Sequence, residues 1–192
     1  DAALSSGLLD YMVQTWPKAR ITIACGPLAV SLFEGFPNLE QLIAVKKEKH
    51  HKHWLKLWRR VVGTRWDIVV DLRNTAVSRL LWAGKVYRYG PHIDRNVHKV
   101  EQMAAVMGLS KVPSPRLWFC KEQQDKARAL APEGQGPVIG IGPAANWHAK
   151  IWPSDNFIEV LSFLTADDGP FSDAKVAVFA APGEERYAQP VL

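Results

Sequence analysis

The segment VIGIGPAANWHAKIWPS, at residues 138–154, decides the fold class of this chain. Its first four residues, Val138–Ile141, are typical of a buried strand, and a helix is expected to start at Ser154. The loop between them holds small residues that let backbone amides approach an anion, and the helix N-terminus adds a favourable dipole. The segment therefore predicts a strand–loop–helix unit of an α/β protein, with an anion site in its loop.

Lys150 stands just before the expected helix, where its charge could neutralise a pyrophosphate. A surface lysine on an ordinary loop between a strand and a helix would give the same pattern. The loop is not a Walker sequence, and it lacks the glycine spacing of the dinucleotide fingerprint. From the residues alone, both interpretations of Lys150 stay open.

Strand and helix patterns alternate on both sides of this segment, which favours doubly wound parallel sheets. We expect further strands at 20–25, 41–45, 67–72, 86–89 and 175–179. Helices are expected at 8–16 with Ser5 and Ser6 as caps, and at 28–33, 46–62, 98–107, 121–131 and 156–165. Ligands bind beyond the carboxyl ends of the strands in such folds, which directs attention to Asp1, the loop 140–153 and the turn 180–186.

The composition excludes several classes of protein. Of 192 residues, 47% are hydrophobic and 22% charged, which is ordinary for a globular chain and excludes intrinsic disorder. Cys25 and Cys120 lie far apart in the sequence, so we expect neither a disulfide scaffold nor a zinc module. This cysteine usage is typical of a protein in the reducing cytoplasm. No apolar run approaches the roughly 18 residues that a membrane span needs.

The positive charge behind the net charge of +5 is not evenly spread, because much of it lies in a basic stretch at 46–60 that alone carries more positive charge than the whole chain does on balance. Its seven lysines and arginines are accompanied by Glu48 as the only acidic residue. Such a patch attracts nucleic acid, acidic lipid or a phosphorylated substrate, and a solvated helix face is the alternative. His50, His51 and His53 lie in the same stretch and imitate a metal site, but we expect no metal there.

Several motifs together resemble one enzyme family. Lys150-Ile-Trp-Pro, after a Gly-Pro-Ala strand end, resembles the Lys-x-Trp-Pro signature of the heptosyltransferases, glycosyltransferase family 9. The opening residues 1–9 resemble the family's Gly-Asp-x-Leu-x-(Ser/Thr)-x-Pro-x-Leu motif, entered after its glycine and with Gly7 in place of the proline. Further similar segments follow in the family's order at 16–22, 36–39, 66–73, 98–101 and 181–185.

The resemblance implies a GT-B architecture, two Rossmann-like doubly wound parallel-sheet domains that face each other across a cleft. A stretch with two prolines at 111–115 and a stretch with two prolines and two glycines at 132–137 read as linkers around the charged helix 121–131. Residues 1–134 would form the N-terminal acceptor-binding domain with a linker helix, and 135–192 the start of the donor-binding domain. The family's Asp-Thr-Gly-x-x-His motif is not reached, so we expect a fragment that lacks the first strand and transfers no heptose alone.

The implied reaction is transfer of heptose from ADP-heptose to the inner core of lipopolysaccharide, on Kdo or heptose, with inversion at the anomeric carbon. Asp1 would be the catalytic base. Lys150 would bind the departing diphosphate with help from Asn146 and Ala145, of which Ala145 can offer only its backbone N–H. Glu184 or Glu185 would bind the ribose hydroxyls. No cofactor is expected, and no metal, because the sequence has no Asp-x-Asp pair.

The anionic acceptor would be bound by residues after the strand at 67–72 and by the basic stretch: Arg73, Asn74, Arg79, Lys52 and Lys56. His98 is expected to start a helix or pack rather than to act in catalysis. The implied location is the cytoplasm, with peripheral contact at the cytoplasmic face of the inner membrane of a bacterial cell envelope.

Two alternatives stay open. The first is a GT-B transferase that uses another nucleotide sugar, which would share the fold and the anion loop. The second is a non-catalytic basic α/β domain that binds nucleic acid through residues 46–60. It lacks a helix-turn-helix, zinc or RNA-recognition signature, so we expect no nucleic-acid partner.

Overall fold

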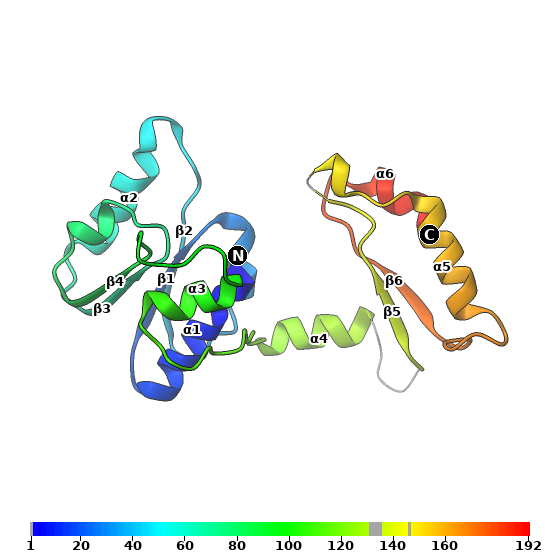
Figure 1. Cartoon of the computed structure of the whole chain (residues 1–192), viewed down its shortest axis with the longest axis horizontal. Coiled ribbons are helices and arrows are strands. Elements are labelled where there is room, and N and C mark those ends of the chain that lie inside the picture. Colours follow the sequence, from blue (N-terminus) through cyan, green and yellow to red (C-terminus); the bar gives the residue numbers. More distant parts are fainter. Residues whose placement is uncertain (1, 131–135, 146) are drawn as a thin grey trace. The chain divides into compact units, whose positions relative to one another are not determined.

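A computed structural model describes residues 2–130, 136–145 and 147–192 of the chain. The chain divides into two compact units, Asp1–Gln123 and Gln124–Leu192, and each is described by itself (Figure 1). The domain boundary that the sequence predicts, between 134 and 135, falls among residues outside the described ranges and stays a prediction.

The first unit contains two pairs of parallel strands. Strand β1 pairs with β2 with Ile23 opposite Leu42, and β3 pairs with β4 with Val69 opposite Val86. The elements follow the order α1 (Ala2–Thr15), β1 (Ile21–Cys25), η1 (Pro27–Leu32), β2 (Leu39–Ala44), η2 (Lys49–His51), α2 (Lys52–Val61), β3 (Trp66–Asp71), η3 (Val77–Arg79), β4 (Ala83–Arg88) and α3 (Lys99–Val106). The α/β class and the parallel strands are therefore confirmed.

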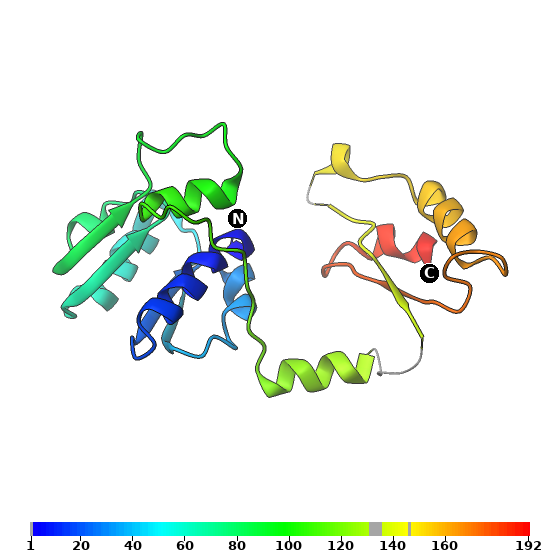
Figure 2. The same ribbon diagram turned by 60° about the horizontal axis from the view of Figure 1, so that its bottom comes forward.

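Two apolar cores hold the first unit together. In one core, Leu8 of α1 packs with Met103 and Met107 at α3, and residues of β3 and β4 such as Val70 and Tyr87 pack against them. Helices α1 and α3 lie side by side in this core (Figure 2). In the other core, Ile43 and Val77 are buried together with Val61 at the end of α2, and further apolar side chains of α2 pack against them. β3 is only half-buried, not fully buried as the sequence predicts, because in the described ranges it pairs with β4 alone.

Two helix predictions are wrong in detail. Ser5 and Ser6 lie inside α1, and their hydroxyls donate to the carbonyls of Ala2 and Ala3 instead of capping the helix start. In the basic stretch the helix begins only at Lys52, because η2 precedes it with His50 and His51 at φ values of 54° and 57°. Two successive residues in the left-handed region cannot continue a right-handed helix.

The segment 113–120 crosses the first unit at close range. The hydroxyl of Ser6 accepts a hydrogen bond from the backbone N–H of Arg116, at 2.9 Å. A Cβ at the neighbouring Gly7 would lie 2.5 Å from the carbonyl oxygen of Pro113, and a Cβ at Gly35 would lie 2.5 Å from that of Trp118. The two glycines therefore let the backbones meet where any side chain would collide.

The second unit is a strand–loop–helix–strand unit, as the sequence predicts. The linker helix α4 (Lys121–Leu130) leads to β5 (Val138–Ile141), η4 (His148–Lys150), α5 (Ser154–Thr165), β6 (Lys175–Val178), α6 (Glu185–Ala188) and η5 (Gln189–Val191). Strands β5 and β6 are parallel. Ile141, Leu161 and Val191 form the core between the strands and α5. The predicted strand at 138–141 and the helix start at Ser154 are both confirmed.

Candidate active site

The two loops expected to bind the donor leave the same edge of the second unit. Ile141 and Val178, the last residues of β5 and β6, lie opposite each other, and the N–H of Phe179 donates to the carbonyl of Ile141 at 2.7 Å. The loop 142–153 and the turn 179–184 therefore both begin at the carboxyl end of this sheet (Figure 1). This edge is where α/β proteins bind ligands.

Lys150 ends the short helix η4 in the first of these loops. Its backbone N–H donates to the carbonyl of Trp147 at 2.9 Å, and its ammonium lies 5.6 Å from the centre of the Trp147 ring. Trp152 packs edge-on against Phe157 of α5 with ring centres 4.9 Å apart, which fixes the end of the loop to the helix. An exposed cation is thereby held just before the N-terminus of α5, an arrangement suited to an anion.

The other predicted phosphate positions precede Lys150. Ala145 is half-buried and can offer its backbone N–H alone. Asn146 lies outside the described residues, and its role stays a prediction.

The turn after β6 carries two carboxylates with different contacts. Glu184 Oε2 accepts the N–H of Ala181 at 3.0 Å, so this side chain folds back on its own turn. Glu185 Oε1 accepts the N–H of Gly183 at 2.9 Å, and this hydrogen bond lowers the pKa of Glu185. Glu185 also lines a shallow hollow of about 320 Å³ beside Ala180 and Pro182. Of the two acids, only Glu185 lines this hollow.

In the first unit a turn after β3 collects the predicted acceptor residues. The carboxylate of Asp71 accepts hydrogen bonds from the N–H of Arg73 at 2.9 Å and from both the N–H and the hydroxyl of Thr75, at 2.6 and 2.9 Å. Asn74 between them has a φ of 53°. Asp71 thus fixes the turn from inside, as Asx turns do.

Arg79 forms hydrogen bonds to two residues of the same turn. Its guanidinium donates to the side-chain oxygen of Asn74 at 2.7 Å and to the carbonyl of Thr75 at 3.0 Å. Arg73 is exposed. The structure therefore brings the three residues together in one turn, where Asn74 and Arg79 bond to each other and Arg73 remains accessible to solvent.

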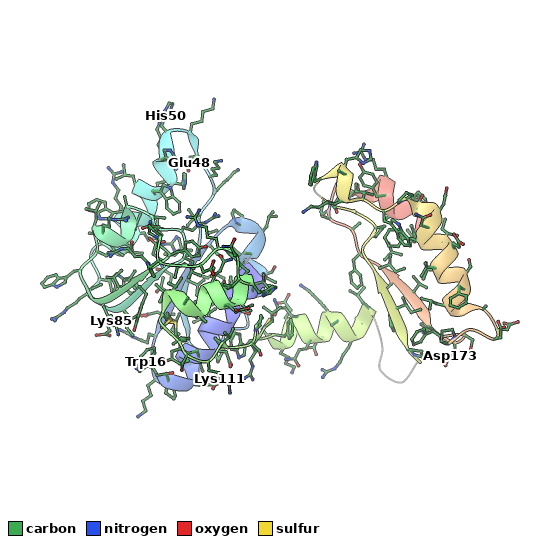
Figure 3. The ribbon with its side chains drawn as sticks, viewed as in Figure 1. Trp16, Glu48, His50, Lys85, Lys111 and Asp173 are labelled. Carbon is green, nitrogen blue, oxygen red and sulfur yellow. The ribbon has the colours of Figure 1, made fainter. Side chains whose placement is uncertain are left out.

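The basic stretch presents a short ion pair at its tip. Lys56 Nζ lies 2.6 Å from Glu48 Oε1, and this hydrogen bond lowers the pKa of Glu48. The N–H of Glu48 in turn donates to Nδ1 of the buried His53 at 3.2 Å. Glu48 and His50 lie in the loop that precedes α2 (Figure 3). Lys52 is exposed, while no group of three or more His, Cys, Asp or Glu within the described ranges is placed to hold a metal ion.

Gln102, a residue that no sequence motif marks, organises the loop after β4. Its amide oxygen accepts the hydroxyl of Tyr89 at 2.6 Å and the ammonium of Lys99 at 3.2 Å. Its amide nitrogen donates to the carbonyls of Arg95 and Val97 at 3.2 and 2.9 Å. The only signal in the sequence was a glutamine among the apolar residues of the helix at 98–107.

His98 and Asp1 are the remaining predicted positions. His98 precedes α3, and its Nδ1 accepts the N–H of Val100 at 3.5 Å, which agrees with the expected role at the helix start. Asp1 lies outside the described residues. No helix within the described ranges is long and apolar enough to cross a membrane.

Three solved structures resemble the chain. A glycosyl transferase family 9 protein from Veillonella parvula has a TM-score of 0.79 at 19% identity, over 98% of this chain and 61% of that chain. E. coli ADP-heptose lps heptosyltransferase II has a TM-score of 0.73 at 18% identity, over 98% and 63%. E. coli heptosyltransferase WaaC with ADP has a TM-score of 0.65 at 17% identity, over 99% and 67%.

These likenesses show the fold, and the chain matches GT-B heptosyltransferases over part of their length. It spans only about three-fifths of the first two of these structures. A comparison with curated proteins finds no match. The model of glycosyltransferase family 9 (heptosyltransferase) matches residues 76–184, which include Arg79, the loop of Lys150 and Glu184. The chain therefore belongs to glycosyltransferase family 9, the heptosyltransferases.

Proposed function

We propose that the protein takes part in the transfer of heptose from ADP-heptose to the inner core of lipopolysaccharide, by a metal-independent displacement that inverts the anomeric carbon. The observation that carries the proposal is the position of Lys150, held by η4 between the carboxyl end of β5 and the N-terminus of α5. Family membership supports it, and so does the similarity to the E. coli heptosyltransferase WaaC with ADP.

The departing ADP needs its charge neutralised while the glycosidic bond breaks. Lys150 supplies a point charge for the diphosphate, the N-terminus of α5 supplies aligned N–H groups, and the N–H of Ala145 with Asn146 completes the phosphate cradle. Glu184 is the proposed partner of the ribose hydroxyls, and Glu185 has the same chemistry beside the hollow. Two O–H donors suit one carboxylate because it accepts through both of its oxygens.

On the acceptor side, one base is sufficient for an inverting displacement. We assign it to Asp1, which removes the proton from the acceptor hydroxyl as that oxygen attacks the anomeric carbon. Arg73 would contact the anionic acceptor directly, while Asn74 and Arg79 hold the turn that carries it. Lys52 and Lys56 would add long-range attraction for the acceptor phosphates. The enzyme would work in the cytoplasm, at the cytoplasmic face of the inner membrane.

The deciding experiment measures ADP release from ADP-heptose by the full-length protein, with Kdo-bearing lipid A as acceptor and in the presence of a chelator. Lys150→Ala should raise the donor KM, while the exposed Lys111→Ala should match the wild type. Charge reversal at Lys52 and Lys56 should raise the acceptor KM alone. Equal turnover with an unrelated nucleotide sugar, or complete loss of activity in the chelator, would overturn the proposal.

A further inference from the structure

Trp147 is a large apolar side chain that the loop 142–153 leaves exposed. Its exposed fraction is 61%, and within the described ranges its ring packs against no other aromatic ring. Trp152, in the same loop, packs against Phe157 of α5 instead. The ring of Trp147 lies beneath the ammonium of Lys150, which is 5.6 Å from the ring centre. A contribution to the core therefore does not account for the tryptophan at this position, and a contact with a cation does.

The backbone brings the two side chains together. The N–H of Lys150 donates to the carbonyl of Trp147 at 2.9 Å, and the N–H of Ile151 donates to the carbonyl of His148 at 3.0 Å. These hydrogen bonds form η4, a 3₁₀ turn that follows Trp147. Side chains three residues apart eclipse in a 3₁₀ turn, so Trp147 and Lys150 extend from the same side of the loop. With the backbone of the turn fixed in this way, the freedom that remains to the cation lies in the lysine side chain.

Within the part of the chain that the structure describes, no carboxylate lies at ion-pair distance from the ammonium of Lys150. A lysine has many rotamers, so an exposed lysine without such a partner spreads its charge over a large volume. The negative face of an indole ring attracts a cation and narrows that volume. An ammonium has three N–H donors, so one that rests over a ring can still donate to an anion on its other side.

We propose that Trp147 is a positioning residue of the donor site, whose ring holds the ammonium of Lys150 where the diphosphate binds. The inference rests on the proposed function, which assigns the diphosphate to Lys150, and it adds what sets the position of that lysine. Trp147 acts through Lys150 and does not contact the nucleotide itself. A cation–π contact at an exposed site changes a binding constant by about two- to fivefold, so removing the ring should weaken diphosphate binding by that factor.

The test is a double-mutant cycle on the full-length protein, with the Kd of ADP and of inorganic pyrophosphate measured by calorimetry. Trp147→Leu should weaken both ligands by about two- to fivefold, and Trp147→Phe, which keeps an aromatic face, should weaken them less. In the Lys150→Met background, Trp147→Leu should have no further effect, because the cation on which it acts is gone. The matched control is Phe163→Leu, at a side chain 72% exposed on α5, which should bind both ligands as the wild type does.

Two further measurements separate the role of Trp147 from the proposed function. In the protein without ADP, the ring current of the indole should shift the ε-methylene protons of Lys150 upfield in the NMR spectrum, and Trp147→Leu should abolish this shift. In the transfer assay, Trp147→Leu should raise the donor KM by the factor measured for ADP. The acceptor KM and the thermal melt should stay as in the wild type.

An ADP affinity that is unchanged or higher in Trp147→Leu would overturn the inference, because the ring would then only compete with the ligand for the ammonium. An equal loss in the Lys150→Met background, or a loss for ADP without one for pyrophosphate, would also overturn it, since Trp147 would then contact the nucleotide itself. Absence of the upfield shift in the wild type would overturn it as well. A wild type that shows the shift but binds neither ligand would reject the proposed function and this role with it. ADP binding and heptose transfer without coupling between the two residues would reject the role of Trp147 alone.

Discussion

Replacing Gln102 by leucine tests whether one buried amide holds the loop that follows β4. Gln102 is 7% exposed, and its side chain makes the hydrogen bonds to Tyr89, Lys99, Arg95 and Val97 described above. Leucine is similar in size, so the change removes hydrogen bonds without opening a large cavity. The loss of stability therefore measures the hydrogen bonds of the amide and not the packing of the side chain.

The size of this loss of stability depends on which hydrogen-bond partners of Gln102 can bond to water instead. Lys99 and the exposed Arg95 can exchange their bonds for water at little cost. The hydroxyl of Tyr89 and the carbonyl of Val97 belong to half-buried residues, and each unsatisfied group costs about 1–3 kcal/mol when buried. Because their burial is partial, we expect Gln102→Leu to lower the free energy of unfolding by roughly 2–4 kcal/mol in total.

The assay is urea denaturation of the full-length protein, paired with hydrogen exchange of the Ile93 amide, which donates to the carbonyl of Gly90 inside the loop. The midpoint should fall at an unchanged slope, and the Ile93 amide should exchange faster. Glu101→Leu, at an exposed position on the same helix, is the control and should change stability by less than about 0.5 kcal/mol. A Gln102→Leu protein as stable as this control, with unchanged exchange at Ile93, would refute the reasoning.

The remaining predictions concern charge. Asp1→Asn removes the proton acceptor and should lower turnover by about 10²–10⁴-fold in a transfer assay; near-normal turnover would place the base elsewhere. Lys150→Ala should weaken ADP binding in calorimetry and Lys150→Arg should restore only part of it, since the two cations differ in shape; unchanged ADP affinity in the alanine variant would count against the site. The hydrogen bond from Lys56 lowers the pKa of Glu48 in the folded protein. The pair therefore stabilises the fold fully at pH values above the ordinary pKa of a glutamate, and this stabilisation is lost as the pH falls through the lowered pKa. An NMR titration should show that pKa rising in Lys56→Met, and an identical titration curve would show that the pair does not form.

The local sequence pattern was sufficient to predict the strands and the ends of the donor loop. Val138–Ile141 and the helix start at Ser154 are visible in the sequence because a β-branched run, a proline and a serine mark them within a few residues. Hydrophobic periodicity likewise located α2, since Trp54, Leu57, Trp58 and Val61 recur at helical spacing.

The predictions that were wrong or missing concern contacts that a local sequence pattern does not reveal. Ser5 and Ser6 have the right chemistry for a cap, but the helix starts earlier and their hydroxyls turn back to carbonyls three residues before them. The start of α2 follows from the left-handed His50 and His51, and the preceding loop also contains a hydrogen bond from the N–H of Glu48 to Nδ1 of His53. The role of Gln102 is not visible in the local pattern because its partner Tyr89 is thirteen residues away, in the loop that follows β4.

The meeting of Gly7 with the carbonyl of Pro113 constrains how this sequence can change. Proline, the residue that the family's motif carries at this position, would bring a Cβ to 2.5 Å from that oxygen, closer than such atoms approach. Backbone cannot yield as a flexible side chain does, so the substitution is tolerated only if the chain at 113–114 takes another path. Positions 7 and 113–114 should therefore show strong epistasis: Gly7→Ala, which keeps the backbone N–H of α1, should be damaging alone and be rescued by changes in the crossing segment, so exchanging the first helix between homologues requires exchanging that segment with it.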